Sequence, residues 1–269
     1  MQRRILIIDD HNDLSKALEE VFSHTGHSVK VVDDRPAALA LGDLSDFDIV
    51  ITDLDVEKRP QGTSNGNGAR CLPNVNGLAG TDDNVKAFKI CATNFRRDDF
   101  DEDELKEFFA TILDYKIRFV DKEDYVRELR ENIEFELPSA VSLMHIILEY
   151  LMKRVEKLGV CKPEQSNLYI ALDEAFVNAV KHGNKFDVRK QVRVIADISG
   201  KEARFTIEDE GEGFDVNSIP DPLDPANLFK PSGRGVLFIY NIMDEVKYNE
   251  RGNRLTMVKK ANKPECQAT

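Results

Sequence analysis

The stretch LDEAFVNAVKHGN at residues 172–184 decides how the second half of this chain folds. Apolar residues recur in it at helical spacing, which predicts a helix that begins at Gln165 and reaches Lys181. Glu174 and Asn178 are four positions apart, so their side chains share one face of that helix. The helix therefore presents, side by side, a carboxylate that can accept a proton and an amide oxygen that can bind Mg2+.

Two glycine motifs follow this helix along the chain. EDEGEGFD at residues 208–215 places Asp209 before a turn that Gly211 and Gly213 allow to close tightly. SGRGVL at residues 232–237 then opens the last helix, whose N-terminal amides favour phosphate. The residues of this motif that free the backbone or add positive charge are Gly233, Gly235 and Arg234. The three motifs in this order predict an ATP site.

The segments around these motifs predict a mixed fold. Residues 133–137 alternate as a strand, and a helix with apolar residues at helical spacing follows over 141–155. Residues 192–198 and 202–207 alternate about a short turn and predict a hairpin, and 254–260 predict a closing strand. Helices and strands in this order favour an α+β two-layer sandwich.

This order of elements and motifs resembles the GHKL ATPase superfamily. Within that superfamily, residues 172–184 and GRGVLFIYNIMDEV at 233–246 are similar to the anti-sigma-factor serine/threonine kinases of bacterial partner switching. The resemblance implies that ATP and Mg2+ are the cofactors. It also implies that Asn178 binds the Mg2+ of ATP, that Glu174 is the catalytic base, and that Asp209 accepts a hydrogen bond from the adenine amine.

Further contacts to ATP follow from the same resemblance. They come from the glycine motifs and from the end of the helix, namely Gly211, Gly213, Gly233, Arg234, Gly235, Lys181 and His182. His182 stands directly before Gly183 at a helix end, so a capping or packing role is an equal alternative for it.

The first half of the chain begins with a different pattern. An apolar strand at residues 4–8 ends at Asp9 and Asp10, and a third predicted strand at 47–52 ends at Asp53. The carboxyl ends of strands in an open parallel sheet line one crevice, so these aspartates are expected to converge around Mg2+. The pattern resembles the receiver domain of response regulators, which has an α/β flavodoxin-like fold. The resemblance implies that an upstream histidine kinase phosphorylates Asp53. It also implies that Asp9, Asp10 and Asp53 hold Mg2+.

The receiver pattern is incomplete after Asp53. The stretch from Arg59 to Asp83 is rich in glycine and asparagine, which predicts a long loop in place of a helix. Aspartates stand at 98–99, where a receiver has the lysine that pairs with phosphate. The candidates to replace that lysine are Arg96, Arg97 and Lys89, and Thr93 is the candidate switch hydroxyl. A receiver-shaped docking platform without phosphorylation is the alternative.

These observations divide the chain into a receiver-like domain at 1–115, a connector at 116–131 and a GHKL ATPase domain at 132–262. The net charge of −12 argues against direct binding of nucleic acid. The longest apolar runs are strand-sized, which excludes a membrane span, and the cytoplasm is the expected compartment. The 4 cysteines lack metal-ligand spacing and are expected to be free thiols.

Three functions are compatible with this organisation. The first is a serine/threonine kinase that phosphorylates an anti-sigma-factor antagonist, sequesters a sigma factor, or does both, and that is gated by the receiver. The resemblance implies that this kinase is a homodimer. The second is a non-catalytic ATP-binding docking module with a degenerate receiver. The third, a hybrid histidine kinase, is disfavoured because His145 lies among core-like residues inside the predicted ATP domain.

Overall fold

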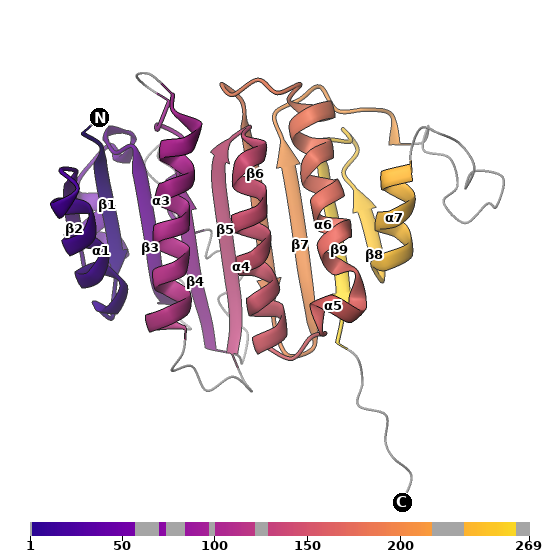
Figure 1. The fold of residues 1–269 in the computed structure, drawn as a ribbon, viewed down its shortest axis with the longest axis horizontal. Helices are drawn as coiled ribbons and strands as arrows, with labels where there is room; N and C mark the ends of the chain where they lie inside the picture. The colour runs from indigo at the N-terminus through magenta and orange to yellow at the C-terminus, as the bar shows by residue number, and fades with distance from the viewer. Residues whose placement is uncertain are drawn as a thin grey trace, which may run out of the picture.

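The computed structural model describes residues 2–56, 70–73, 84–96, 100–121, 129–216 and 234–261. Its strands are β1 (Arg4–Asp9), β2 (Ser28–Val32), β3 (Ile49–Val56), β4 (Asn84–Cys91), β5 (Leu129–Pro138), β6 (Gln191–Ile198), β7 (Glu202–Asp209), β8 (Glu245–Tyr248) and β9 (Arg254–Lys260). Within the described residues these nine strands form one sheet in the order β2-β1-β3-β4-β5-β6-β7-β9-β8, which extends across the molecule (Figure 1).

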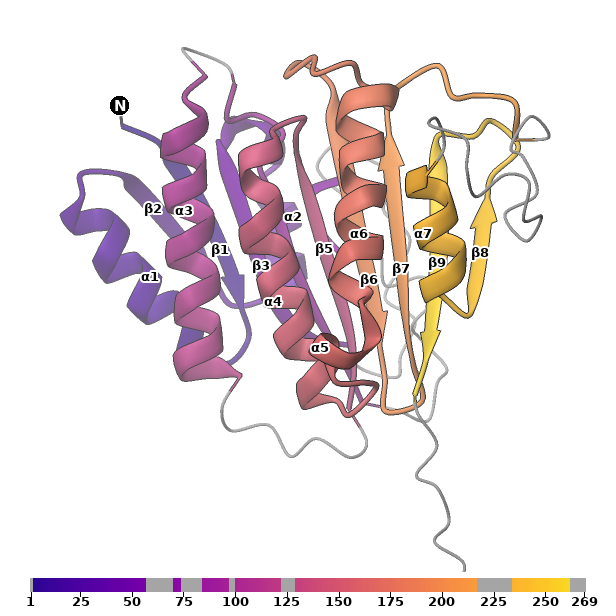
Figure 2. The same ribbon diagram turned by 45° about the vertical axis from the view of Figure 1, so that its right-hand side comes forward.

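Helices cover the two faces of this sheet unequally. The α-helices are α1 (Asp13–His24), α2 (Arg35–Ala40), α3 (Glu102–Tyr115), α4 (Met144–Lys157), α5 (Pro163–Ser166), α6 (Leu168–Val177) and α7 (Arg234–Ile242). Shorter helical segments are η1 (Leu44–Asp46), η3 (Lys116–Val120), η5 (Val141–Leu143) and η6 (Asn178–Gly183). The helices α3, α4, α6 and α7 lie on one face (Figures 1 and 2). None of the described helices is both long and apolar enough to cross a membrane.

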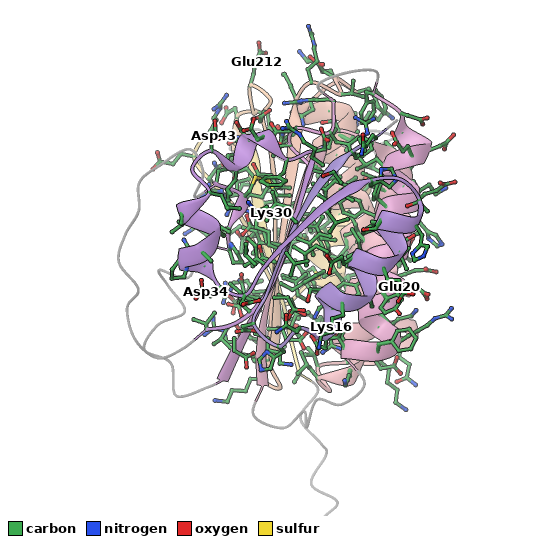
Figure 3. All side chains as sticks on the ribbon, turned by 90° about the vertical axis from the view of Figure 1, so that its left-hand side faces the viewer. Lys16, Glu20, Lys30, Asp34, Asp43 and Glu212 are labelled. Atoms are coloured by element: carbon green, nitrogen blue, oxygen red, sulfur yellow. A yellow bond between two sulfur atoms is a disulfide. The ribbon has the colours of Figure 1, made fainter. Side chains whose placement is uncertain are left out.

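The opposite face is covered at the N-terminal end of the sheet. Figure 3 shows Lys16 and Glu20 of α1 on one side of the strands, and Asp34 and Asp43, which precede α2 and η1, on the other. Asp34 begins α2 by accepting a hydrogen bond from the Ala37 amide at 2.7 Å. The first strands therefore have helices on both faces, as expected for parallel strands.

The parallel arrangement predicted for the first half holds for three strands only. β1 pairs in parallel with β2 and β3, and Asp9 lies in register with Asp53. β4, however, is antiparallel to β3, so the predicted wholly parallel flavodoxin-like sheet is wrong at this strand. An antiparallel neighbour needs no crossover helix, and the glycine-rich stretch before β4 predicts none. Most of that stretch lies outside the described residues.

The sheet continues without a break into the second half of the chain. β4 pairs in parallel with β5 from Asn84 opposite Leu129 to Cys91 opposite Glu136. Phe88 of the first half, Phe135 of β5 and Tyr150 of α4 pack as a cluster, with ring centroids 5.8 to 6.3 Å apart. Both halves therefore share one hydrophobic core beneath the helices.

The cysteines differ from the expectation of free thiols. Cys71 and Cys91 form a disulfide with their Cα atoms 5.4 Å apart, and Cys161 is a buried free thiol. The bond lies in a small core beneath α2, with Leu6, Ile8 and Val50. The prediction failed because the two cysteines are 20 residues apart in sequence, and only the packing of the stretch 70–73 in the same small core as the end of β4 brings them together.

Candidate functional site

The predicted acid and amide lie at the junction of α6 and η6. Leu172 and Phe176 are almost fully buried and hold α6 against the core. Glu174 and Asn178 are half-buried on the neighbouring face. Asn178 begins η6, a π-helical segment, and such segments occur often at functional sites. The predicted helix is thus confirmed around Glu174, but it changes its hydrogen bonding at the residue predicted to bind Mg2+.

Glu174 lies directly against the start of α7. A Cβ atom added at Gly235 would stand 1.7 Å from the Glu174 Oε1 atom and 2.1 Å from its Cδ. Only glycine permits this approach, since real Cβ contacts are far longer. The second glycine of the Gly-x-Gly motif therefore makes room for the Glu174 carboxylate.

Asp209 closes the far end of β7 and is mostly buried. Its Oδ1 atom accepts a hydrogen bond from the Gly211 amide at 2.8 Å. A Cβ atom at Gly183 would lie 2.3 Å from the Asp209 Cγ atom, so the end of η6 packs directly on this carboxylate. Burial raises the pKa of Asp209, against the opposing effect of the Gly211 amide. Its Oδ2 atom accepts no hydrogen bond from the described residues and remains available to a ligand donor.

The turn after Asp209 rests on the loop before β9. Gly213 has φ +78°, and a Cβ atom there would lie 1.9 Å from the Arg251 carbonyl oxygen. Arg251 in turn donates a hydrogen bond from Nη2 to the Gly211 carbonyl at 2.8 Å. Asn253 donates from Nδ2 to the Asp209 carbonyl at 2.7 Å. The lack of a side chain at both glycines of this motif and the positive φ of Gly213 therefore permit close contact between the two loops.

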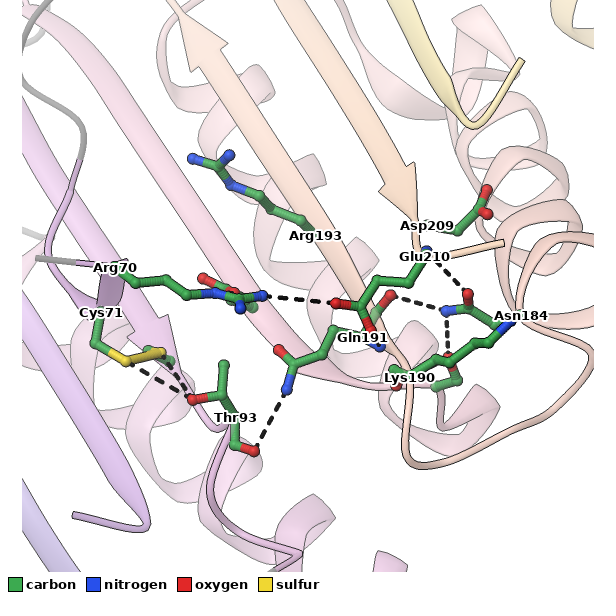
Figure 4. Close-up of polar contacts among 12 residues, drawn as sticks. Arg70, Cys71, Thr93, Asn184, Lys190, Gln191, Arg193, Asp209 and Glu210 are labelled. Atoms are coloured by element: carbon green, nitrogen blue, oxygen red, sulfur yellow. Dashed lines mark hydrogen bonds and ion pairs between the residues drawn. A yellow bond between two sulfur atoms is a disulfide. The ribbon is translucent and has the colours of Figure 1, made fainter. Parts of the chain in front are cut away.

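Asn184 is a structural centre of the site that the sequence reasoning left without a role. It is 1% exposed, and its Nδ2 atom donates to Ser139 Oγ at 2.6 Å and to the Gln191 carbonyl at 2.8 Å. Its Oδ1 atom accepts from the Glu210 amide at 2.9 Å (Figure 4). The available signal was its place at the end of the stretch 172–184, directly after Gly183.

The part of the chain that the structure describes shows no side-chain hydrogen bond for the remaining predicted ATP-binding residues. Lys181 and His182 are exposed on η6, and neither side chain has a hydrogen-bond partner among the described residues. Arg234 is the first residue of α7, but its side chain lies outside the described part of the chain. Gly233 also lies outside the described residues.

The predicted receiver aspartates have three different environments. Asp9 is buried, and its carboxylate accepts from the Ser15 amide at 2.8 Å and the His11 amide at 3.1 Å, which orders the start of α1. The Asp10 carboxylate accepts a hydrogen bond from the Asp55 backbone amide at 2.9 Å, and its other oxygen contacts the His11 ring. Among the described residues no group of three or more acidic, histidine or cysteine side chains has metal-binding geometry. Mg2+ binding by Asp9, Asp10 and Asp53 therefore stays a prediction.

Asp53 is buried against a lysine that the sequence reasoning missed. Lys116, the first residue of η3, donates from Nζ to Asp53 Oδ2 at 2.7 Å and also lies 3.3 Å from Asp121 Oδ1. Burial raises the pKa of Asp53 to about 6, although the Lys116 ammonium opposes the shift. The two carboxylates raise the pKa of Lys116 despite its burial.

This pair continues into the second half of the chain. Asp121 Oδ2 lies 3.1 Å from Nη1 of Arg154 in α4. Arg154 also donates to both carboxylate oxygens of Glu131 in β5. A buried ionic network thus joins Asp53 to α4 and β5, and each charge has an opposite charge beside it, as burial requires.

The residues proposed to replace the receiver lysine have other partners. Lys89 is 1% exposed and donates to Glu134 Oε1 at 2.7 Å and to Glu136 Oε2 at 3.3 Å. Arg96 donates to the Val188 carbonyl at 3.1 Å. Arg97 lies outside the described residues. Neither described candidate contacts Asp53.

Comparison with known proteins shows what the second half of the chain is similar to. Residues 137–259 match the family model described as histidine kinase-like ATPase domain. This range contains Glu174, Asn178 and Asp209, of which Glu174 lies against the start of α7 and Asp209 against the end of η6. The comparison supports the predicted GHKL-type ATPase half.

Particular relatives are protein kinases. The chain is 28% identical over 142 residues to the serine-protein kinase RsbW of Staphylococcus epidermidis, covering 50% of this chain and 89% of that protein. It is 24% identical over 136 residues to the serine-protein kinase RsbW of Bacillus cereus, covering 48% of this chain and 84% of that protein. The relatives thus correspond to about half of this chain.

Proposed function

We propose that this protein is an ATP-dependent serine/threonine kinase of a partner-switching system. Its substrate would be an anti-sigma-factor antagonist, and the same protein would also sequester a sigma factor, with its activity gated by the N-terminal half. The similarity to serine-protein kinases supports the class of reaction. The observation that carries the catalytic claim is the contact of Glu174 with Gly235 at the start of α7, beside the helix end predicted to receive phosphates.

Two features of the structure support the proposal that Asp209 contacts ATP. Gly183 and Gly211 let the backbone of η6 and of the turn after β7 pack directly against the Asp209 carboxylate, which fixes the direction in which it would face a base. Asp209 Oδ2 accepts no hydrogen bond from the described residues, which suits it to accept one from the adenine amine. Asn178 would hold Mg2+ through its amide oxygen. Bound ATP and Mg2+ would supply the γ-phosphoryl group and offset its charge.

Glu174 would act on the substrate hydroxyl. Its carboxylate would accept the proton from the serine or threonine oxygen, and the contact with Gly235 would fix its direction. The added phosphate would place negative charge on the antagonist and weaken its contact with the kinase. We further propose that the kinase is a homodimer, that it acts in the cytoplasm, and that an upstream histidine kinase would phosphorylate Asp53.

A degenerate receiver is the second candidate for the N-terminal half. Lys116 already occupies the Asp53 carboxylate within a buried network, and this arrangement favours a structural role for Asp53. In the corresponding alternative function, the protein binds ATP and docks on its partner without phosphoryl transfer.

The test uses γ-labelled ATP, Mg2+ and a lysate of the source organism. Wild-type protein is compared with Glu174→Gln and with Glu149→Gln, which changes an exposed glutamate of α4. Label on a small serine- or threonine-phosphorylated protein that requires Glu174, but not Glu149, supports the kinase. Nucleotide binding without any transfer of label would favour the docking module.

A further inference from the structure

The disulfide between Cys71 and Cys91 lies close to the candidate nucleotide site. Cys91 ends β4, and its partner belongs to the short described stretch 70–73. Cys91 is 1% exposed and Cys71 is 6% exposed. Their Cα separation of 5.4 Å is the usual one for such a bond. The pair therefore ties a segment distant in sequence to the centre of the sheet.

Polar contacts lead from this bond to the end of β7 (Figure 4). The Thr93 hydroxyl lies 3.8 Å from the Cys71 sulfur and 3.6 Å from the Cys91 sulfur. The Thr93 carbonyl accepts a hydrogen bond from Gln191 Nε2 at 3.3 Å. The backbone amide of Gln191 then donates a hydrogen bond to Glu210 Oε2 at 2.8 Å. Glu210 follows Asp209, the proposed adenine contact.

Arg70 provides a second and more direct connection. It precedes Cys71, and its Nε atom donates to Glu136 of β5. Its Nη2 atom lies 3.8 Å from Glu210 Oε1, and its carbonyl accepts from Lys89 Nζ at 2.7 Å. The position of the Arg70 guanidinium therefore depends on where Cys71 is held.

The disulfide thus restrains Glu210 from the side opposite to Asn184. Glu210 receives Arg70 at one carboxylate oxygen and the Gln191 amide at the other. Its own amide donates to Asn184. Because Glu210 is the next residue in the chain, these contacts also fix the backbone of Asp209.

We propose that Cys71 and Cys91 are a redox-active pair, which is reduced and reoxidised in the cell. When the disulfide is formed, it holds Arg70 against Glu210 and thereby strengthens the binding of ATP at Asp209. This inference rests on the proposed nucleotide site. The co-reactant is a cellular dithiol/disulfide couple. A thiolate of the reduced couple attacks the more exposed sulfur, Cys71, and releases the Cys91 thiolate, which takes a proton. The second thiol of the couple then breaks the mixed disulfide and releases Cys71 as a thiol, so two electrons pass to the pair.

Reduction removes a covalent restraint on Arg70 but no residue of the site. The Arg70 and Glu210 side chains are 59% and 47% exposed, and the pair is therefore weak. Loss of one exposed ion pair corresponds to a change of about two- to fivefold in affinity. The redox state would therefore tune ATP binding and would not abolish it.

The experiment measures disulfide state and affinity on the same samples. The full chain is equilibrated in mixtures of reduced and oxidised dithiothreitol, trapped with acid and alkylated, and the bond is quantified by peptide mass. The dissociation constant of a fluorescent ATP analogue with Mg2+ is measured in parallel. We expect it to rise about two- to fivefold as the disulfide is lost.

Three variants test the route of the effect. A chain with Cys71→Ser and Cys91→Ser should bind like reduced protein under all conditions. Arg70→Gln should keep the bond but lose the response of affinity to redox state. The matched control changes Cys161→Ser and Cys266→Ser, retains only the pair, and should respond like wild type.

The outcomes separate this inference from the proposed function. Two results would overturn the redox inference while the nucleotide site stands. One is alkylation of both cysteines at every ratio of reduced to oxidised dithiothreitol, and the other is a dissociation constant that does not change with the fraction of disulfide. An absence of nucleotide binding in both redox states would overturn the nucleotide site and, with it, the coupling. A rise in the dissociation constant that is retained in Arg70→Gln would also contradict the proposed route.

Discussion

Lys116 donates a hydrogen bond to Asp53 at 2.7 Å, and both side chains are almost completely buried. The two residues are 63 positions apart in sequence. Lys116 also faces Asp121, which pairs with Arg154 of α4. The aspartate predicted to accept phosphate is therefore part of an ionic network that reaches the ATPase half.

Replacing Lys116 by methionine should strongly destabilise the fold at neutral pH. The Lys116→Met variant leaves Asp53 buried without its cation, and loss of one partner of a buried pair costs about 3–5 kcal/mol. Urea unfolding at pH 7 measures this loss. Lys153→Met, which changes an exposed lysine of α4, is the control and should change stability by less than about 0.5 kcal/mol. Equal effects of the two variants would contradict a role for the buried pair.

The stability of the protein should depend on the protonation of Asp53. Burial raises its pKa from 3.8 to about 6, so the folded state holds this proton more tightly than the unfolded chain. The stabilisation from this proton is complete below the unfolded pKa and is lost as the pH rises through about 6. Lys116, Asp121 and Asp9 are the charged groups that act on Asp53.

The measurement compares wild type with Asp53→Asn by urea unfolding between pH 3 and pH 7. The free energy of unfolding of wild type, relative to the variant, should fall by up to about 3 kcal/mol across this range. A constant difference between the two proteins would show that Asp53 titrates alike in the folded and unfolded states.

Much of the second half of the fold follows from local sequence pattern. The predicted strands at 192–198 and 254–260 correspond to β6 and β9 almost residue for residue. Alternation of apolar and polar residues marks them because one face of these strands is buried. The reversed direction of β4 was not predictable in this way, since periodicity identifies a strand but not its partner.

The site was predictable only where its residues are close in sequence. Glu174 and Asn178 share a helix face by their spacing, and Asp209 is marked by the glycines after it. Lys116 and Arg70 act through long-range contacts, and no local pattern distinguishes them from the other lysines and arginines of the chain. The predicted helix from Gln165 to Lys181 also missed the left-handed residue Asn167, which separates α5 from α6.

Gly235→Ala should reduce transfer of phosphate more than it reduces stability. The new Cβ atom would overlap the Glu174 carboxylate and force it away from its position, while overpacking costs about 1–3 kcal/mol. The checks are the γ-labelled ATP assay and urea unfolding. Gly200→Ala is the matched control, because a Cβ atom there would stand 3.8 Å from its nearest neighbour, the Leu158 carbonyl. Full activity of Gly235→Ala would refute the proposed role of Glu174.

Asn184→Ala should weaken ATP binding through the end of β7. The change leaves the Ser139 hydroxyl, the Gln191 carbonyl and the Glu210 amide without their shared partner. Each buried group left unpaired costs about 1–3 kcal/mol, so the variant should unfold at a lower urea concentration. Its remaining folded fraction should bind the fluorescent ATP analogue more weakly, because Glu210 no longer fixes the backbone of Asp209.

The control for this variant is Asn241→Ala, which removes an exposed asparagine whose side chain, among the described residues, bonds only to the Leu237 carbonyl of α7. It should leave both stability and affinity close to those of wild type. Affinity is measured in buffer without urea, under conditions where both variants are folded. Loss of binding is thereby separated from loss of structure. If Asn184→Ala lowers stability while the dissociation constant stays at the wild-type value, Asn184 supports the core alone. If both change together and Asn241→Ala changes neither, the hydrogen bond to Glu210 transmits order to the adenine contact.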